Sequence, residues 1–323
     1  MKAVVVEQFG GPEAMQLADR PEPVAGPGEV VVDVEFAGIN FMDTGMRTNS
    51  MGNFQAPLVP GAEGAGRVRS LGPGVTEFSE GDRAAWAFVF GSYAERIVAA
   101  TDTLVPVPED ISSDIAAAVM MQGLTAHHFT QEVAPLPAGT TALVHAAAGG
   151  VGQLVVQMLK ERGVRVIGLV SRPEKKQAAT DAGADHVLVT RDGDFVQDVL
   201  DLTDAHGVDA VFDNSDEHVF PATLKVLARS ATVCWYGPLM GTGPVLPLAA
   251  IPRSARISYG VFMDHIATRE HLLAHSNDLF NRIRTGTLSI TTPQRYALAD
   301  AAQAHRDIES RATTGKLLID MSL

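Results

Sequence analysis

A glycine-rich turn at residues 146–152 (AAAGGVG) constrains the fold of this chain more than any other segment. The apolar run at 141–146 predicts a buried strand before the turn, and apolar residues at helical spacing predict a helix over 149–162. A further apolar run at 164–170 predicts the next strand. A plain flexible turn is the alternative, but this strand–turn–helix–strand context favours a dinucleotide-binding turn.

The turn follows a Gly-x-Gly-x-x-Gly pattern with Ala147 in its first position. Ala147 allows the tight turn, Gly149 lets the backbone approach a pyrophosphate, and Gly152 lets the helix pack against the strand. The backbone of Gly150 and Val151 lies at the expected helix N-terminus, which attracts anions. These positions therefore predict a pyrophosphate site.

The chain after residue 112 alternates between predicted helices and strands. Helices are expected at 174–182 and 195–202, and strands at 186–189, 208–212 and 231–236. Uniformly apolar strands alternating with helices are typical of a parallel sheet that is buried on both faces. The fold class is α/β, with a Rossmann doubly wound parallel sheet over residues 122–264.

The first part of the chain has a different texture, with short strands separated by glycine and proline turns. Strands are predicted at 2–6, 29–36, 66–70, 83–87 and 92–98. The segment 29–36 alternates, which places Val30, Val32, Val34 and Phe36 on one face. These strands predict a compact, barrel-like β domain over residues 1–121. After helices at 269–284 and 299–310, a strand following the turn at 313–315 returns to this domain, so residues 265–323 complete it.

Composition narrows the possible partners and compartments. The formal net charge of −13 over 323 residues disfavours nucleic acid and anionic membranes as partners. The single cysteine, Cys234, excludes an intrachain disulfide and a multi-cysteine zinc site. The N-terminal apolar run is too short for a signal peptide, and no run is long enough to span a membrane. These features predict a cytoplasmic protein.

The tip of the second Rossmann strand indicates which dinucleotide binds. Sites for NAD place an acidic residue there, about 20 residues after the turn. This chain has Ser171, Arg172 and Lys175 instead, and Arg191 follows the next strand. Cations and hydroxyls suit a 2′-phosphate, so we expect NADP(H) rather than NAD(H), although an exposed, solvated basic turn is the alternative.

In their order along the chain, several motifs resemble the zinc-independent quinone oxidoreductases related to zeta-crystallin, within the medium-chain dehydrogenase/reductase superfamily. The motifs are residues 37–43 (AGINFMD), 60–66 (PGAEGAG), 91–95 (GSYAE), 122–126 (QGLTA), 145–152 (HAAAGGVG) and 314–316 (TGK). The resemblance implies a GroES-like β-barrel domain followed by a Rossmann domain, with the active site in the cleft between them.

The resemblance also implies that no metal takes part in the reaction. Zinc-dependent members carry a cysteine where this chain has Asn40 and a histidine where it has Ala62, and they have a cysteine-rich zinc lobe. Amide and methyl groups do not replace thiolate and imidazole as zinc ligands. Glu63 is interpreted as structural. We expect hydride transfer from NADPH to a quinone or an α,β-unsaturated carbonyl, without zinc.

The resemblance assigns further residues to the cofactor. Asn40 and Thr125 are placed near the nicotinamide, where Asn40 binds either an acceptor carbonyl or a ribose hydroxyl, or only fastens its own loop. Asn214, Tyr236 and Gly237 end neighbouring strands at the cofactor edge. Lys316 is expected to reach the cofactor phosphates, or to be an ordinary surface lysine.

Several alternatives stay open at this stage. The function is an NADPH:quinone oxidoreductase or enone reductase, an enoyl-thioester reductase of a biosynthetic pathway, or a non-catalytic NADPH-binding protein. Water, Tyr93 and Tyr259 are candidate proton donors. The adjacent His127 and His128 are interpreted as structural or exposed, because neighbouring helix residues point in different directions. A homodimer is expected through an edge strand at 255–263.

Overall fold

The structure, a computed structural model, describes residues 1–190, 193–237, 243–291 and 293–323. These form two compact units. The first unit comprises residues 1–121, 266–286 and 290–323, and the second comprises residues 122–265 and 287–289. His265 and residues 287–289 thus lie in the second unit, outside the range 122–264 expected for the Rossmann domain.

The second unit is built on a six-stranded sheet in which all paired strands are parallel. The strand order is β10-β9-β8-β11-β12-β13, the 3-2-1-4-5-6 order of a dinucleotide-binding sheet. The strands are β8 (Thr141–Val144), β9 (Arg165–Val170), β10 (His186–Val189), β11 (Val208–Asp213), β12 (Leu227–Trp235) and β13 (Arg256–Tyr259).

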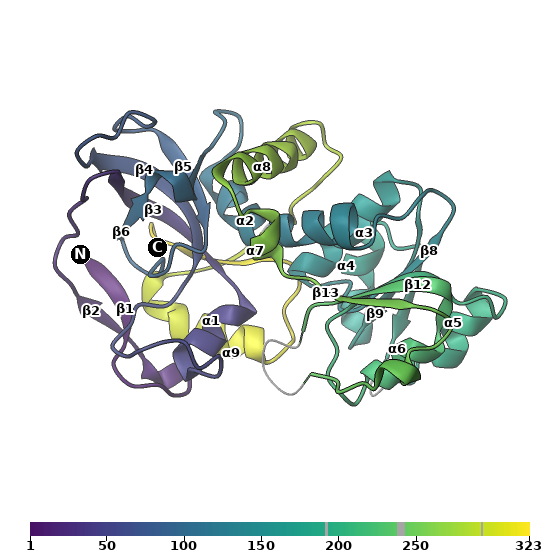
Figure 1. Cartoon of the computed structure of the whole chain (residues 1–323). Coiled ribbons are helices and arrows are strands. Elements are labelled where there is room, and N and C mark those ends of the chain that lie inside the picture. The colour runs from purple at the N-terminus through teal and green to yellow at the C-terminus, as the bar shows by residue number, and fades with distance from the viewer. Residues whose placement is uncertain (191–192, 238–242, 292) are drawn as a thin grey trace. The chain divides into compact units, whose positions relative to one another are not determined.

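Helices precede, connect and follow these strands and cover the sheet (Figure 1). They are the last part of α2 (Ser113–His128), α3 (Gly150–Glu161), α4 (Lys176–Asp181), α5 (Val196–Leu202), α6 (Phe220–Lys225) and α7 (Phe262–His265). Right-handed crossovers place α3 and α4 on one face and α5 and α6 on the other, and the helices within each pair touch. The predicted doubly wound α/β sheet is confirmed.

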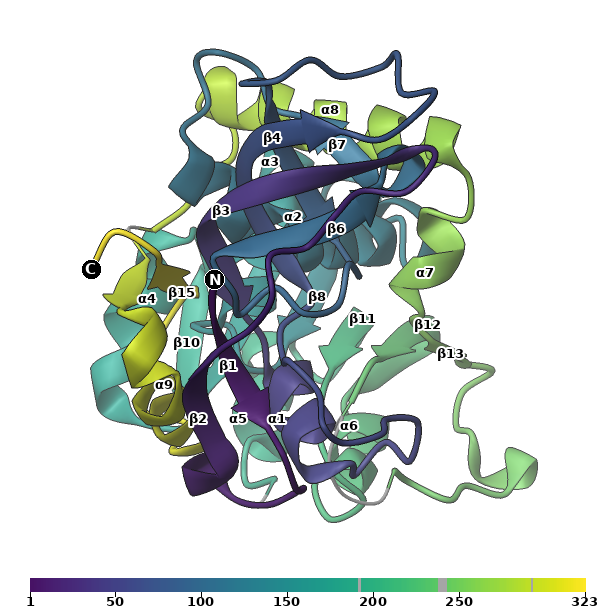
Figure 2. The ribbon, with the colours of Figure 1, turned by 90° about the vertical axis from the view of Figure 1, so that its left-hand side faces the viewer.

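The first unit contains a mainly antiparallel seven-stranded sheet and a separate hairpin (Figure 2). The main path runs β14-β15-β3-β4-β5-β7, and β6 pairs with the other part of β3. The strands are β1 (Lys2–Val6), β2 (Met15–Asp19), β3 (Glu29–Ile39), β4 (Glu63–Leu71), β5 (Arg83–Ala87), β6 (Arg96–Ala100), β7 (Leu104–Pro106), β14 (Gln294–Tyr296) and β15 (Leu317–Asp320).

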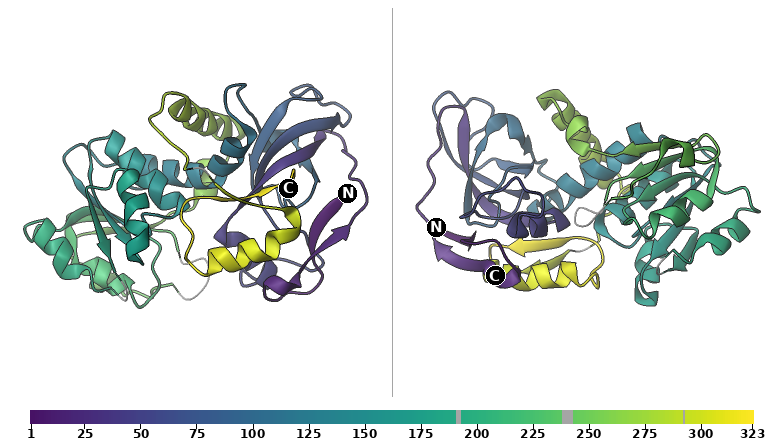
Figure 3. Two further views of the ribbon diagram at one scale, coloured as in Figure 1. Left: turned by 180° about the vertical axis from the view of Figure 1, so that it is seen from behind. Right: turned by 60° about the horizontal axis from the view of Figure 1, so that its bottom comes forward.

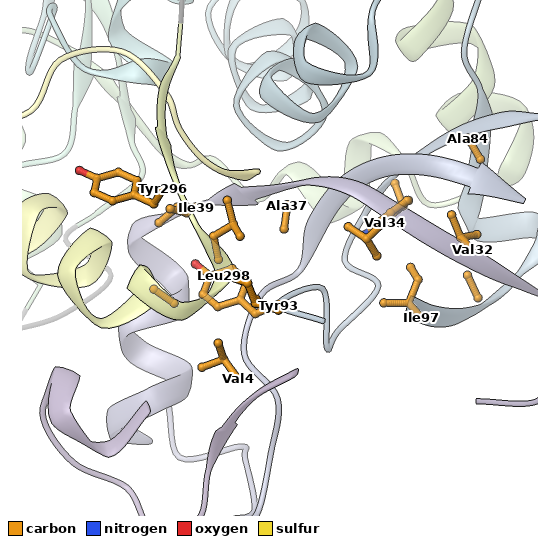
Figure 4. Close-up of a cluster of buried hydrophobic side chains, with 14 of the residues drawn as sticks. Val4, Val32, Val34, Ala37, Ile39, Ala84, Tyr93, Ile97, Tyr296 and Leu298 are labelled. Carbon is orange, nitrogen blue, oxygen red and sulfur yellow. The ribbon is translucent and has the colours of Figure 1, made fainter. Parts of the chain in front are cut away.

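Strand β3 carries the core of this unit, but its alternation is interrupted. Val32 and Val34 face the buried cluster as predicted, and Ala37 and Ile39 join them (Figure 4). Phe36 does not, because the pairing with β4 shifts register between Val34 and Phe36. Such a bulge moves the following side chains to the opposite face. The prediction that Phe36 lies on the core face is therefore wrong, and its half-buried ring instead lies beneath Arg295.

The C-terminal segment completes the first unit. Strand β15 pairs antiparallel with β3, so the last residues lie beside a strand from the start of the chain. Helix α9 (Ala301–Glu309) contacts α1 (Phe41–Thr48) and β2, and both chain ends lie in this unit (Figure 3). Helix α8 (Arg269–Arg284) also belongs to it. Among the described residues, no helix combines the length and apolar character that a membrane span requires.

Candidate functional site

The glycine turn joins β8 to α3 through a tightly bonded backbone. Ala146 adopts a left-handed conformation with φ 48°. The Ala147 N–H donates to Leu169 O at 3.0 Å, which ties the turn to β9, and the Gly149 N–H donates back to Ala146 O at 2.8 Å. Gly149 is extended and caps α3, which begins at Gly150. The strand, turn and helix therefore follow one another as predicted.

Gly152 is required because the backbone beside it leaves no space for a side chain, whereas Gly150 faces the flexible end of a glutamine side chain. A Cβ on Gly152 would lie 2.2 Å from Ala146 O, and one on Gly150 would lie 1.8 Å from Oε1 of Gln122. The first intrahelical bond runs from the Gln153 N–H to Gly149 O at 2.9 Å. The N–H groups of residues 150–152 come before it and remain directed out of the helix end. This backbone fits the pyrophosphate of a dinucleotide.

The carboxyl ends of the parallel strands bring further predicted residues to the same edge. Asn214 follows β11 and Tyr236 follows β12, and these two strands are paired up to Asp213 and Trp235. A Cβ on Gly237 would lie 3.5 Å from Asn214 Cα, so the two strand ends are close. Thr125 is half-buried in α2, on the turn of helix after the Gln122 that touches the glycine turn.

The basic turn after β9 is exposed beside this edge. Ser171 and Arg172 are exposed, while Lys175 is half-buried at the end of the 3-10 helix η4 (Pro173–Lys175). Since β9 pairs with β8, this turn and the glycine turn end adjacent strands. Arg191 lies outside the described residues.

A buried polar group lies where β8 and β11 end. Asp213 accepts hydrogen bonds from the Ser215 N–H at 2.6 Å and from the Thr223 hydroxyl at 2.5 Å. Nε2 of His145 lies 3.3 Å from the Thr223 hydroxyl. Burial lowers the pKa of His145, against the opposing effect of the Asp213 carboxylate. The polar run at residues 213–218 indicated an unusual end of β11. Sequence spacing could not identify His145 as part of this polar group.

The first unit contains a second polar group, which we call the Asn40 centre: Asn40, Glu63 and Lys316. Nδ2 of Asn40 donates to Glu63 Oε2 at 2.7 Å, and Nζ of Lys316 donates to Asn40 Oδ1 at 2.8 Å and to the same Glu63 oxygen. The other Glu63 oxygen accepts from the Met121 N–H at 2.6 Å. All three side chains are buried, so the ion pair is shielded from water.

The Asn40 centre rules out one of the two expectations for Lys316. The lysine is not an ordinary surface residue, because it is only 3% exposed and is bound to Glu63 and Asn40. Its contact with cofactor phosphates stays a prediction. Glu63 is fully buried, and its interpretation as structural stays a prediction. Asn40 is fastened through both polar atoms of its amide, which leaves one Nδ2 hydrogen for another acceptor.

A third set of buried polar residues continues from the Asn40 centre, and no sequence pattern indicated it. Oδ2 of Asp43 accepts from the Asn40 N–H at 2.8 Å and from the Tyr93 hydroxyl at 2.9 Å, and Tyr93 also lies 3.2 Å from Nε2 of His305. Burial raises the pKa of Asp43 to about 7 and lowers the pKa of His305 to about 3. Residues 43, 93 and 305 are too distant in sequence for a pattern to connect them.

Comparisons with known proteins agree with this architecture. The family model for the alcohol dehydrogenase GroES-like domain matches residues 26–109, and the model for zinc-binding dehydrogenases matches residues 150–277. A quinone oxidoreductase of Pseudomonas aeruginosa is 36% identical over 324 residues, which cover 98% of this chain and 99% of that protein. A 2-haloacrylate reductase of a Burkholderia species is 28% identical, with 98% of each chain covered.

A solved structure extends the likeness to the whole chain. A mycobacterial protein in complex with NADPH superposes with a TM-score of 0.94 and 37% identity, covering 99% of this chain and 100% of the other. The matches span both units, which have the GroES-like and Rossmann architectures expected from the sequence. The chain therefore belongs to the zeta-crystallin-like quinone oxidoreductases, the zinc-independent branch of the medium-chain dehydrogenase/reductase superfamily.

Proposed function

We propose that this oxidoreductase transfers hydride from NADPH to a quinone or an α,β-unsaturated carbonyl, without a catalytic metal. The observation that carries the proposal is the N-terminus of α3, where glycines at 149, 150 and 152 leave backbone N–H groups open to a pyrophosphate. The basic turn at 171–175 on the adjacent strand supplies the cations that a 2′-phosphate requires. The NADPH complex of the mycobacterial relative supports the same cofactor.

Each part of the cofactor has candidate partners at the carboxyl ends of the parallel strands. The N–H groups of residues 150–152 bind the pyrophosphate, with Ala147 keeping the turn tight. Ser171, Arg172 and Lys175 bind the 2′-phosphate, together with Arg191. The nicotinamide end is assigned to Thr125 and to the strand ends at Asn214, Tyr236 and Gly237. Lys316 stays a further candidate for the phosphates, which would require its ammonium to serve Glu63 and the cofactor together.

The bound cofactor would supply the hydride from the nicotinamide C4. The chain supplies orientation, and we assign the remaining amide hydrogen of Asn40 to the carbonyl oxygen of the acceptor. Glu63 and Lys316 hold that amide in one orientation. Water is the proposed proton source, because Tyr93 is fully buried and donates to Asp43. The residues at 40 and 62 suit no zinc ion, since neither offers a thiolate or an imidazole.

A substrate panel tests the reaction class. NADPH oxidation is measured with a benzoquinone, an enone and an enoyl thioester, each before and after treatment with a chelator. The proposal expects turnover with the quinone or the enone that the chelator leaves unchanged. Turnover confined to the enoyl thioester would favour the biosynthetic reductase. Tight NADPH binding without turnover would favour a binding protein, and loss of turnover on chelation would contradict the metal-free reaction.

The role of Asn40 is tested with Asn40→Ala, in comparison with Asn49→Ala. Asn49 is the C-cap residue directly after α1, in the same unit. We expect Asn40→Ala to lower kcat about a hundredfold while NADPH affinity stays within a factor of about three, because the lost contact orients the acceptor. Asn49→Ala should retain kcat. Equal kcat in the two variants would show that Asn40 only fastens its loop.

We also propose a cytoplasmic homodimer in which β13 pairs across subunits. This strand is the edge of the parallel sheet, and Tyr259 at its end is 59% exposed. An open edge with unpaired backbone groups favours pairing with a second copy. Light scattering after size exclusion should give twice the chain mass at micromolar concentration, and a monomer would contradict the proposal.

A further inference from the structure

Four ligand-forming side chains gather in the second unit, and the proposed reaction uses none of them. We call them the histidine cluster: His127, His128, Glu132 and His265. The first two end α2, Glu132 lies in the following π-helical turn η3 (Phe129–Val133), and His265 ends α7. The three histidines are buried, with 2–8% of their surface exposed.

A π-helical turn follows directly after the two consecutive histidines, which both lie near one partner. It widens the helix directly after His128. The rings of His127 and His128 each have their centroid 5.0 Å from that of His265. The alternative that these two histidines are exposed is therefore wrong, because both are buried and both rings approach the same partner. Helical breaks of this kind are frequent at functional sites.

The cluster is joined through specific ring nitrogens. Glu132 receives one histidine on each carboxylate oxygen: Nδ1 of His128 lies 2.9 Å from Oε2, and Nδ1 of His265 lies 2.9 Å from Oε1. Nε2 of His265 lies 2.8 Å from Nδ1 of His127. His265 therefore directs one nitrogen toward Glu132 and is held in orientation through the other.

We propose that His128, Glu132 and His265 form a binding site for a divalent transition-metal ion of the zinc type. Their ligand atoms all lie within 4.8 Å of one another. Two imidazole nitrogens and one carboxylate oxygen are a zinc donor set, and three protein ligands leave a position for water. Glu132 is 50% exposed on its side chain, so an ion can enter from solvent without opening the core.

His127 would not bind the metal but would orient one of its ligands, His265. A histidine that binds a metal through one nitrogen usually donates the other N–H to a nearby acceptor, which fixes the ring. Nδ1 of His127 is placed to accept from Nε2 of His265. This residue is therefore a positioning residue of the metal site.

Without an ion, the same atoms form a carboxylate–imidazole network. Burial acts to raise the pKa of Glu132, but the charge of His265 and the hydrogen bond with His128 outweigh it, so the pKa is lowered. A metal bound at the two Nδ1 atoms competes with protons for the imidazoles, so binding should weaken as the pH is lowered.

This site is independent of the proposed reaction. It involves neither Asn40 nor Ala62, the positions at which zinc-dependent relatives carry ligands. Metal binding is measured directly, so a failure to bind metal would not contradict the proposed NADPH-dependent reaction. Conversely, inactivity on the substrate panel would not affect a metal titration.

The experiment titrates Zn²⁺ into the chelator-treated, full-length protein by calorimetry and records the visible spectrum with Co²⁺. We expect one equivalent to bind, with cobalt bands of a four-coordinate nitrogen and oxygen site. His265→Ala and Glu132→Gln should each weaken Zn²⁺ binding at least about a hundredfold, and His127→Gln about tenfold or more. His218→Ala, which removes an 85% exposed histidine from a loop, is the matched control and should bind like wild type.

Three results would overturn the proposal: no cobalt bands with wild type, equal Zn²⁺ affinity of wild type and Glu132→Gln, or equal loss in His218→Ala. Glu132→Gln guards against misfolding, because its half-exposed side chain tolerates an amide of the same size. Circular dichroism melts without metal show whether each variant is folded. Wild type should also bind Zn²⁺ at least about tenfold more tightly at pH 8 than at pH 5.5, since protons compete for the imidazoles.

Discussion

The two units form their polar sites in opposite ways. The Asn40 centre relies on side chains, with an ammonium, a carboxylate and an amide buried together and joined across 276 residues of sequence. The glycine turn relies on backbone, with alanine or glycine at six of the seven positions 146–152 and a basic turn after the next strand. In the Asn40 centre, opposite buried charges stabilise each other. In the glycine turn, the absence of side chains leaves space for a ligand to reach the backbone.

This difference determines how much stability or cofactor affinity a substitution in each site should remove. Removing one member of a buried ion pair leaves an uncompensated charge, which is strongly destabilising. Adding a methyl group to a glycine that touches backbone distorts a binding surface. Removing an exposed cation weakens one contact. The effects of substitution should therefore decrease in this order.

The largest expected effect is that of Lys316→Met. It leaves the Glu63 carboxylate buried without its cation and should lower the free energy of unfolding by about 3–5 kcal/mol. Urea unfolding is followed by the fluorescence of Trp86, which lies in the core of the first unit, in a Trp235→Phe background. The double variant Glu63→Gln/Lys316→Met should recover more than half of the loss. A single variant as stable as its background would show that the pair is not a buried charge site.

Asp43→Asn should change how stability depends on pH. Burial raises the pKa of Asp43 to about 7 from 3.8. Between these values the folded state holds a proton that the unfolded state has lost, so the free energy of unfolding falls as pH rises. Asparagine does not titrate. Its stability relative to wild type should therefore rise from pH 4 to pH 8, by up to about 4 kcal/mol.

Unfolding of both proteins at pH 5, 6, 7 and 8 measures this difference. The largest part of the change should fall below pH 7. Parallel curves for wild type and Asp43→Asn would mean that Asp43 titrates in its ordinary range.

Gly152→Ala should weaken NADPH binding about a hundredfold, because its Cβ would lie 2.2 Å from Ala146 O and α3 must shift. Gly149→Ala is the matched variant in the same turn. Its Cβ would lie 3.2 Å from the same oxygen, so the loss should stay below about tenfold. Calorimetric titration with NADPH measures both, and similar affinities would contradict the role of close packing at Gly152.

The smallest expected effect is that of Arg172→Ala. Loss of one exposed cation should weaken NADPH binding about tenfold and leave NADH binding unchanged. Arg229→Ala removes an equally exposed arginine near the amino end of β12, away from the carboxyl edge of the sheet, and should change neither affinity. A parallel loss for both cofactors would place Arg172 outside the 2′-phosphate site.

Much of the fold could be predicted because it depends on local patterns. The strands Lys2–Val6, Arg83–Ala87 and His186–Val189 and the helix Arg269–Arg284 have the predicted bounds. Other strands begin or end at residues that differ from the prediction, because pairing with neighbouring strands determines where a strand ends. The pairing of β3 with both β4 and β15 lengthens it to Ile39, three residues beyond the predicted end. The bulge that turns Phe36 outward likewise arises from pairing, which alternation does not report.

The sequence by itself determined the strand–turn–helix at residues 141–161 and the order of elements around it, because these follow from nearest neighbours along the chain. Only the tertiary structure decided which polar side chains meet. It joined Lys316 to Glu63 and Asn40, Tyr93 to Asp43, and His265 to His127 and His128. The physical reason is that a buried charge or imidazole needs a partner in space, and folding can draw that partner from any distance along the chain.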